Sequence, residues 1–162
     1  MEKSGQVQGG VEKKLASLGL TVPLAPPPVA TYVPAVQVGD FVITSGQIPF
    51  SEGELRYQGK VGKDLTLEEG YQAARLAVLN CLGAIKSVVG SLDQVERVVR
   101  LAGYVNSAPD FTQQSQVVNG ASDLLGEIFG PQGHHARVAI GASELPINAA
   151  VEIELVVKLK SE

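Results

Sequence analysis

The sequence predicts a two-layer α+β domain in which two long helices cover one face of a β-sheet. Three observations favour this class. Residues 66–89 repeat apolar side chains at spacings of three and four, the period of a helix with one buried face. Residues 149–160 alternate apolar and polar side chains, the period of a strand. The order of elements has no sustained strand–helix–strand rhythm and no internal repeat, which argues against a parallel α/β fold.

The length and composition fit one globular domain. The chain has 162 residues, enough for one substantial core and short for two. Tryptophan is absent and aromatic residues are only 5%, so the core must be built from Val, Leu, Ile and Ala. We predict a single domain over residues 31–162. We expect residues 1–30 to form a polar tail, a short helix at Val11–Leu18 and an extended arm around the PLAPPP segment at 23–28.

The charge balance and the single cysteine argue against several classes of protein. The net charge is −4, whereas a nucleic-acid surface needs clustered Lys and Arg. No apolar run reaches about 18 residues, so we expect no membrane span, and the N-terminus lacks the apolar core of a signal peptide. Cys81 has no partner for an internal disulfide, which fits a reducing compartment and predicts a cytoplasmic protein. Because it lies on the apolar stripe of a helix, we expect Cys81 to be a buried small hydrophobe.

The first half of the domain is predicted to contain a β-hairpin and a long helix. The segment YVPAVQVGDFVITSGQIP, residues 32–49, has two β-rich runs that meet at Gly39-Asp40, a turn signal. The helix begins with the capping-box pair Thr66 and Glu69, and Gly90 is a suitable C-terminal stop.

The second half is predicted to contain a strand, a helix, a loop and two final strands, at Val95–Val105, Asp110–Ile128, 130–135, Arg137–Ala142 and Ala149–Lys160. The segment SELPIN joins the last two strands, and we predict that they form an antiparallel hairpin. Arg137 would then share a face with Glu152 and Glu154, within cross-strand reach. Val138 and Ile140 would belong to the buried face of the sheet.

Arg137 is the strongest candidate for a binding residue. Its neighbours on the predicted face, Ala139 and Gly141, are small and leave space beside the guanidinium. An arginine above small side chains can grip a ligand carboxylate with its bidentate fork. The alternative is a structural salt bridge to Glu152 or Glu154, and on spacing alone this is the more common arrangement.

Other candidate motifs are weaker. His134 and His135 are adjacent, so in an extended chain they point apart, and no nearby ligand spacing completes a metal site. Dinucleotide, P-loop and serine-hydrolase motifs are absent. Ser45 lies at the end of a strand without a neighbouring base, so the residues alone favour a turn or cap role over a nucleophile.

Two segments resemble the RidA (YjgF) family, which is also named endoribonuclease L-PSP. One is the hairpin segment at 32–49, and the other is ARVAIGASELPINAAVEIE, in which Leu145-Pro146 has the family's spacing from Arg137. The resemblance covers residues 31–160, and the longer N-terminal arm is typical of a divergent subgroup. It implies a chorismate-mutase-like fold, a mixed sheet with two long helices on one face. It also implies a homotrimer with ligand sites in the clefts between subunits.

The resemblance further implies a hydrolase, an enamine/imine deaminase. Such an enzyme converts 2-aminoacrylate-type intermediates to 2-keto acids and ammonia, with no cofactor and no metal. Arg137 matches the family's carboxylate-binding arginine, and Glu152 matches the glutamate associated with the catalytic water. Tyr32, Ser45 and Asn119 match residues of the substrate cleft.

The strand that carries Arg137 departs from the family pattern. Ala139 stands in the substrate cleft where the family usually has cysteine, so any property that rests on that thiol should be absent. The hydrolysis itself does not require the thiol.

Other functions stay open at this stage. The trimer clefts could bind small imino or keto acids without turnover, in a regulatory or chaperone-like role. An endoribonuclease would need a basic and aromatic surface that the acidic composition does not predict. Chorismate mutase shares the fold but needs several convergent cations, of which only Arg137 is well placed.

Overall fold

The structure is a computed structural model that describes residues 10–25, 27 and 30–162. The tail predicted over residues 1–9, and residues 26, 28 and 29 of the proline-rich arm, lie outside the described residues. The sheet strands are β1 (Ala35–Val38), β2 (Phe41–Thr44), β5 (Val95–Asn106), β6 (Ala136–Ala142) and β7 (Val151–Leu159), and the helices are α1 (Val11–Ser17), α2 (Leu67–Val89) and α3 (Gln114–Phe129). The other elements of the described residues are a small separate hairpin, β3 (Phe50–Ser51) and β4 (Glu54–Leu55), and the 3₁₀ turns η1 (Leu92–Gln94), η2 (Gly130–Gly133) and η3 (Pro146–Asn148).

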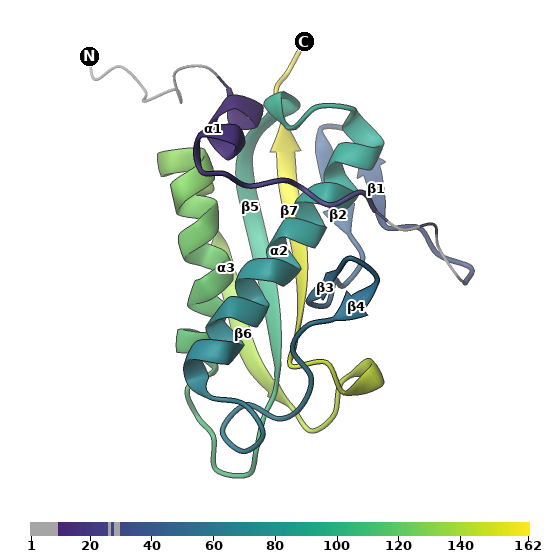
Figure 1. Cartoon of the computed structure of the whole chain (residues 1–162). Helices are drawn as coiled ribbons and strands as arrows, with labels where there is room; N and C mark the ends of the chain where they lie inside the picture. The colour runs from purple at the N-terminus through teal and green to yellow at the C-terminus, as the bar shows by residue number, and fades with distance from the viewer. Residues whose placement is uncertain (1–9, 26, 28–29) are drawn as a thin grey trace.

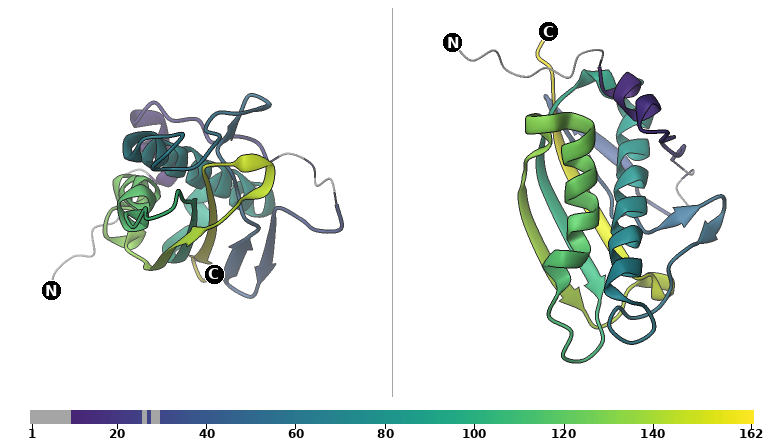
Figure 2. Two further views of the ribbon diagram at one scale, coloured as in Figure 1. Left: turned by 90° about the horizontal axis from the view of Figure 1, so that it is seen from below. Right: turned by 60° about the vertical axis from the view of Figure 1, so that its left-hand side comes forward.

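The predicted two-layer α+β architecture is confirmed. The strands form one mixed five-stranded sheet in the order β1-β2-β7-β5-β6. Helices α2 and α3 lie side by side on one face of this sheet (Figure 1), and in the turned views of Figure 2 no helix of the described residues covers the other face. The arrangement is that of the chorismate-mutase-like fold. The two sides of the sheet therefore differ, and we call them the helix-bearing face and the open face.

The short N-terminal helix α1 is tied to the core of the domain. Val11 and Leu15 are buried. The Glu12 carboxylate accepts a hydrogen bond from the backbone N–H of Leu92 at 3.0 Å and pairs with Lys86 Nζ at 3.0 Å. These contacts fix α1 to the end of α2 and to the turn η1, so this helix is not a free appendage.

Helix α2 begins and ends where the capping signals predict. The Thr66 hydroxyl accepts a hydrogen bond from the Glu69 N–H, and the Glu69 carboxylate accepts one from the Thr66 N–H. Gly90 ends the helix with a positive φ of 83°. By length and composition α2 is apolar enough to cross a membrane, but much of it is buried against the sheet and α3, as in the core helix of a globular domain.

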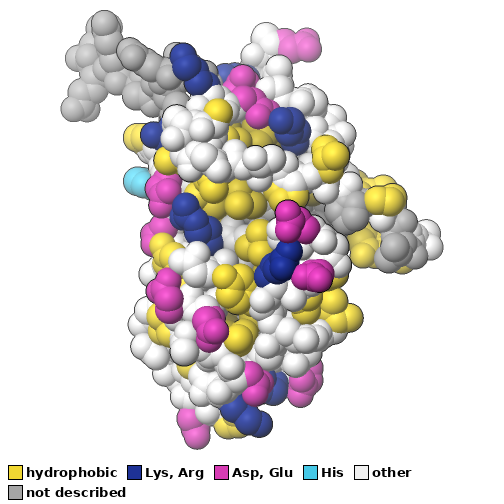
Figure 3. Space-filling model, in the orientation of Figure 1, with side chains coloured by type: hydrophobic (Ala, Val, Ile, Leu, Met, Phe, Trp, Pro, Cys, Tyr) yellow, Lys and Arg dark blue, Asp and Glu magenta, His cyan; other side chains and the backbone are white. Residues whose placement is uncertain are grey.

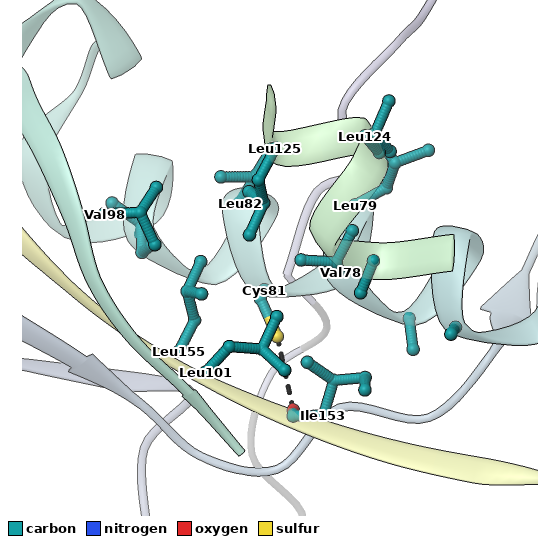
Figure 4. Packing of buried hydrophobic residues seen from close by; sticks show 14 of the residues in the cluster. Val78, Leu79, Cys81, Leu82, Val98, Leu101, Leu124, Leu125, Ile153 and Leu155 are labelled. Atoms are coloured by element: carbon teal, nitrogen blue, oxygen red, sulfur yellow. Dashed lines mark hydrogen bonds between the residues drawn. The ribbon is translucent and has the colours of Figure 1, made fainter. Parts of the chain in front are cut away.

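Cys81 is a core residue, as the periodicity predicts. It is fully buried among Leu82, Leu101 and Leu155, and its Sγ donates to the carbonyl oxygen of Ile153 at 3.2 Å (Figure 4). Burial raises the pKa of this thiol to about 12. Cys81 therefore stays protonated and unreactive at neutral pH.

Helix α3 starts four residues later than predicted. Asp110 has a φ of 65°, in the left-handed region, which a right-handed helix cannot include. Farther along, α3 approaches α2 so closely that a Cβ on Gly120 would lie 2.0 Å from the carbonyl oxygen of Tyr71. Glycine is thus required where the backbones of the two helices meet.

The predicted hairpin of the last two strands is wrong. Strand β5 lies between them, parallel to β6 and antiparallel to β7, so that Leu101 pairs with Arg137 on one side and with Leu155 on the other. Strand alternation reports the face of each side chain and not the neighbouring strand. The segment between β6 and β7 is long enough to pass the end of β5, and it turns through the positive φ values of Ile147 and Asn148.

This topology also reverses the predicted faces of β6. Arg137 shares the helix-bearing face with Leu101, whereas Val138 and Ile140 lie on the open face, where Ile140 is 46% exposed. Several other large apolar side chains are exposed on the open face, namely Val36, Val38, Phe41 and Ile43. An exposed apolar sheet face of this kind is typical of a protein–protein interface.

The contact between α2 and α3 gives a stability prediction. Gly120→Ala should lower the free energy of unfolding by about 1–3 kcal/mol, because the new methyl group overlaps the α2 backbone. Gly126→Ala is the matched control in the same helix, because its Cβ would meet nothing within 4 Å. It should stabilise the protein by about 0.5–1 kcal/mol. Chemical denaturation checks both values, and equal midpoints for Gly120→Ala and the wild type would contradict the close approach.

Candidate functional site

The Arg137 side chain is held by helix α3. Its Nη1 donates to Asn119 Oδ1 at 2.8 Å and to Ser122 Oγ at 3.1 Å, and its Nη2 donates to the Ser115 carbonyl oxygen at 3.4 Å. Asn119 and Ser122 are three positions apart in the helix, so both point to the same side. We call Arg137, Asn119 and Ser122, with His135 beside them, the Arg137 half-site.

These contacts leave one edge of the guanidinium open. The group carries five N–H donors. The hydrogen bonds of the described residues engage Nη1 twice and Nη2 once, and none of them uses Nε. The Nε–H, with Nη2 beside it, therefore remains available as a fork for a carboxylate. A salt bridge from Arg137 to Glu152 or Glu154, the alternative left open by the sequence, is absent from the described residues.

His135 lies beside Arg137 and contacts Ser122. Its Nε2 is 2.9 Å from Ser122 Oγ, and its Nδ1 is 2.6 Å from the Gly133 carbonyl oxygen. Burial lowers the pKa of His135, and the nearby charges of Arg137 and His134 lower it further against the raising effect of the Gly133 carbonyl. The ring is therefore neutral at pH 7. A surface pocket of about 640 Å³, bordered by Ser122, His135 and Arg137, opens at this place.

Glu152 lies in a second group of residues, which we call the Glu152 half-site. The segment after β2 runs beside β7 here, because Gln47 and Ile153 exchange backbone hydrogen bonds of 2.8 and 2.9 Å. A Cβ on Gly46 would lie 2.2 Å from Glu152 Oε1, so any larger residue would displace the carboxylate from this place. Burial raises the pKa of Glu152, and the neighbouring Glu154 carboxylate raises it further.

Tyr32 and Ser45 belong to the same half-site. The Ser45 hydroxyl donates to the Val33 carbonyl oxygen at 2.6 Å, and the Ser45 N–H donates to the Pro34 carbonyl oxygen at 2.8 Å. Ser45 thus anchors the segment that carries Tyr32, whose side chain is 57% exposed. Tyr32, Gly46 and Glu152 border a pocket of about 510 Å³ whose other walls are largely apolar.

One chain does not bring the two half-sites together. Arg137 points to the helix-bearing face of the edge strand β6, whereas Glu152 lies two strands away on β7 and pairs with Tyr104. The predicted cross-strand neighbourhood of Arg137 and Glu152 is therefore wrong within a single chain. Ala139 lies on the helix-bearing face with Arg137, partly buried against the core.

Sequence reasoning did not identify Ser122 and Gly46, and it set His135 aside. The sequence holds a pattern that points to Ser122 and another that points to His135. Ser122 lies one helical turn after Asn119, and His135 lies two residues before Arg137, on the same side of an extended chain. Within the part of the chain that the structure describes, no cluster of three or more His, Cys, Asp or Glu side chains could hold a metal ion.

Comparison with known proteins identifies the family. A family model described as "YjgF/chorismate_mutase-like, putative endoribonuclease" matches residues 12–159. The chain belongs to the YjgF/RidA family. The match begins within α1, so most of this short helix is included in the region that the family shares.

Individual proteins with similar sequences or structures also cover most of this chain. Protein TCP17 of Trypanosoma cruzi is 42% identical over 154 residues, which cover 94% of this chain and 96% of TCP17. A 2-iminobutanoate/2-iminopropanoate deaminase of Dermatophagoides farinae is 32% identical over 143 residues, covering 87% of this chain and 95% of that protein. The crystal structure of Atu1372 from Agrobacterium tumefaciens, a protein of unknown function, matches with a TM-score of 0.86 and 39% identity, covering 93% of this chain and 92% of Atu1372.

The raised pKa of Glu152 gives a prediction about stability. The folded state disfavours the charged carboxylate, so this penalty is present above the folded-state pKa and is lost as the pH falls toward 4.5. Glu152→Gln should therefore raise the melting temperature at pH 7 and change it little at pH 4. Glu162→Gln, at the exposed C-terminus, is the control. Thermal unfolding at both pH values measures the effect, and a lower melting temperature for Glu152→Gln at pH 7 would contradict it.

Proposed function

We propose that this protein is an enamine/imine deaminase that hydrolyses 2-aminoacrylate-type intermediates to 2-keto acids and ammonia. The observation that carries the proposal is the Arg137 guanidinium, which α3 holds along one edge while a carboxylate-binding fork stays open on the other. Membership of the family and the 32% identity to a 2-iminobutanoate/2-iminopropanoate deaminase support it.

The proposed chemistry assigns different tasks to the two half-sites. Arg137 binds the substrate carboxylate and orients the adjacent C=N carbon. Water attacks this carbon, so that a C–O bond forms while the C=N electron pair moves to nitrogen, and Glu152 accepts a proton from the water. Glu152 returns this proton to nitrogen to give a carbinolamine. The carbinolamine hydroxyl proton then moves to nitrogen, again by way of Glu152, so that the C–N bond breaks as the C=O bond forms and ammonia leaves. A carboxylate with a raised pKa is better suited to this general-base role than an ordinary glutamate.

The separation of the half-sites supports a site between subunits. The Arg137 half-site lies at the β6 edge, and the Glu152 half-site lies toward the opposite, β2 side of the sheet. We propose a ring-shaped homotrimer in which the β6 edge of one subunit meets the Glu152 half-site of the next. Such a head-to-tail contact can close into a ring. The apolar side chains of the open face would be covered in this assembly.

A charged surface for RNA has less support. On the helix-bearing face, acidic and basic side chains are interspersed and do not gather into one basic patch (Figure 3). The proposed ligand is accordingly a small imino or keto acid, bound by a single arginine.

The proposal predicts the effect of removing Arg137. Arg137→Ala should lower kcat/KM for 2-iminopropionate by about 100-fold or more, because the carboxylate loses the group that orients it. Arg137→Lys should recover little, since lysine lacks the planar fork. Release of ammonia and keto acid from an imine generated in situ, measured above spontaneous hydrolysis, is the assay. Arg56→Ala, which breaks only exposed ion pairs to Glu52 and Glu54, is the control. Calorimetric binding of a keto acid by a wild type that releases no ammonia would instead favour a non-catalytic binding protein.

A mixing experiment tests the site between subunits. Arg137→Ala and Glu152→Gln chains should each be inactive alone. Unfolded together in equal amounts and refolded, they should regain about a quarter of wild-type activity, because three quarters of random trimers are mixed and each mixed trimer contains one intact site of three. Light scattering should confirm the trimer. If each site lay within one chain, the mixture would stay inactive.

A further inference from the structure

We infer that Ser122 and His135 are positioning residues, which hold Arg137 in the orientation that binds a carboxylate. This inference rests on the proposed role of Arg137, and it extends the site to a serine and a histidine that contact no substrate. Three hydrogen bonds link the Gly133 carbonyl, His135, Ser122 and Arg137 in a chain.

The direction of each hydrogen bond follows from the groups at its ends. The Gly133 carbonyl can only accept, so His135 Nδ1 carries the proton. In a neutral imidazole the other nitrogen is then an acceptor, so His135 Nε2 receives the Ser122 O–H. This directs the lone pairs of Ser122 Oγ toward Arg137 Nη1 at 3.1 Å. Each donor thus meets an acceptor from one end of the chain to the other.

His135 prevents a competing contact of Ser122. A serine inside a helix commonly turns its hydroxyl to the carbonyl four residues earlier, which here belongs to Val118. With the His135 ring in place, the hydroxyl hydrogen is engaged on the strand side of the helix. Without the ring, we expect the hydroxyl to turn back toward its own helix and the Arg137 contact to weaken.

The backbone fixes His135 itself. The turn η2 packs so closely on α3 that a Cβ on Gly133 would lie 2.2 Å from the Leu125 carbonyl oxygen. Arg97 Nη2 donates to the His134 carbonyl oxygen at 2.8 Å and so holds the residue that lies between Gly133 and His135. The imidazole is therefore presented to α3 by a segment with little freedom, as a positioning role requires.

The experiment compares loss and rescue at both positions. Ser122→Ala and His135→Ala should each weaken binding of 2-oxobutanoate about 3- to 10-fold in calorimetry, as the loss of one hydrogen bond predicts, and should raise KM more than they lower kcat. Ser122→Thr keeps the hydroxyl and should bind as the wild type does. His135→Gln keeps an acceptor close to the place of Nε2 and should bind better than His135→Ala. Ser87→Ala, on α2, is the matched serine control.

The outcomes separate this inference from the proposed function. If Arg137→Ala abolishes imine hydrolysis but Ser122→Ala and His135→Ala bind 2-oxobutanoate like the wild type, the inference fails and the deaminase proposal stands. If the wild type hydrolyses no imine but the binding series behaves as described, the deaminase proposal fails and the inference stands. Loss confined to kcat would indicate a serine–histidine catalytic pair and would overturn the positioning role. Nitrogen NMR that finds the proton of neutral His135 on Nε2 would also overturn it.

Discussion

Strand β5, which lies between β7 and the edge strand β6, is the element on which the rest of the structure depends. It pairs in parallel with β6 and antiparallel with β7, and its side chains on one face lie beneath α3, whereas α2 lies mainly over β7. Any other order of these strands would change which residues face α3. The position of Arg137 under that helix, and its distance from Glu152, both follow from the place of β5 between the two final strands.

The two half-sites differ in how the surroundings act on their charged group. Arg137 is surrounded by neutral acceptors, which satisfy part of its hydrogen-bonding capacity without neutralising its charge. Glu152 is partly desolvated and lies near a second carboxylate, so its charged form is disfavoured. A guanidinium that has no ion pair among the described residues and a partly desolvated carboxylate do not serve stability alone. Their presence in one chain is typical of a protein whose folded state retains reactivity for a ligand.

The sequence predicted the individual elements well and their pairing less well. Helix α2 could be predicted because its capping box and apolar stripe are local features, determined within a few residues of chain. Strand faces along β7 followed from alternation in the same way. The error at β6 arose because alternation carries no information about which strand lies next to it. The start of α3 was missed because Asp110 adopts a backbone conformation that its residue type permits but does not require.

The candidate site illustrates the same limit. Arg137 stood out because the small residues beside it leave space for a ligand, but its partners are on a helix that only the folded chain brings near. Gly46 is the converse case, since its role is to have no side chain where the Glu152 carboxylate lies. The residue at position 46 therefore decides where the carboxylate of residue 152 can lie. A chain that has the glutamate but a larger residue at position 46 would have to hold the carboxylate in another place. This pair of positions thus offers a marker for whether a related chain holds its carboxylate as this one does.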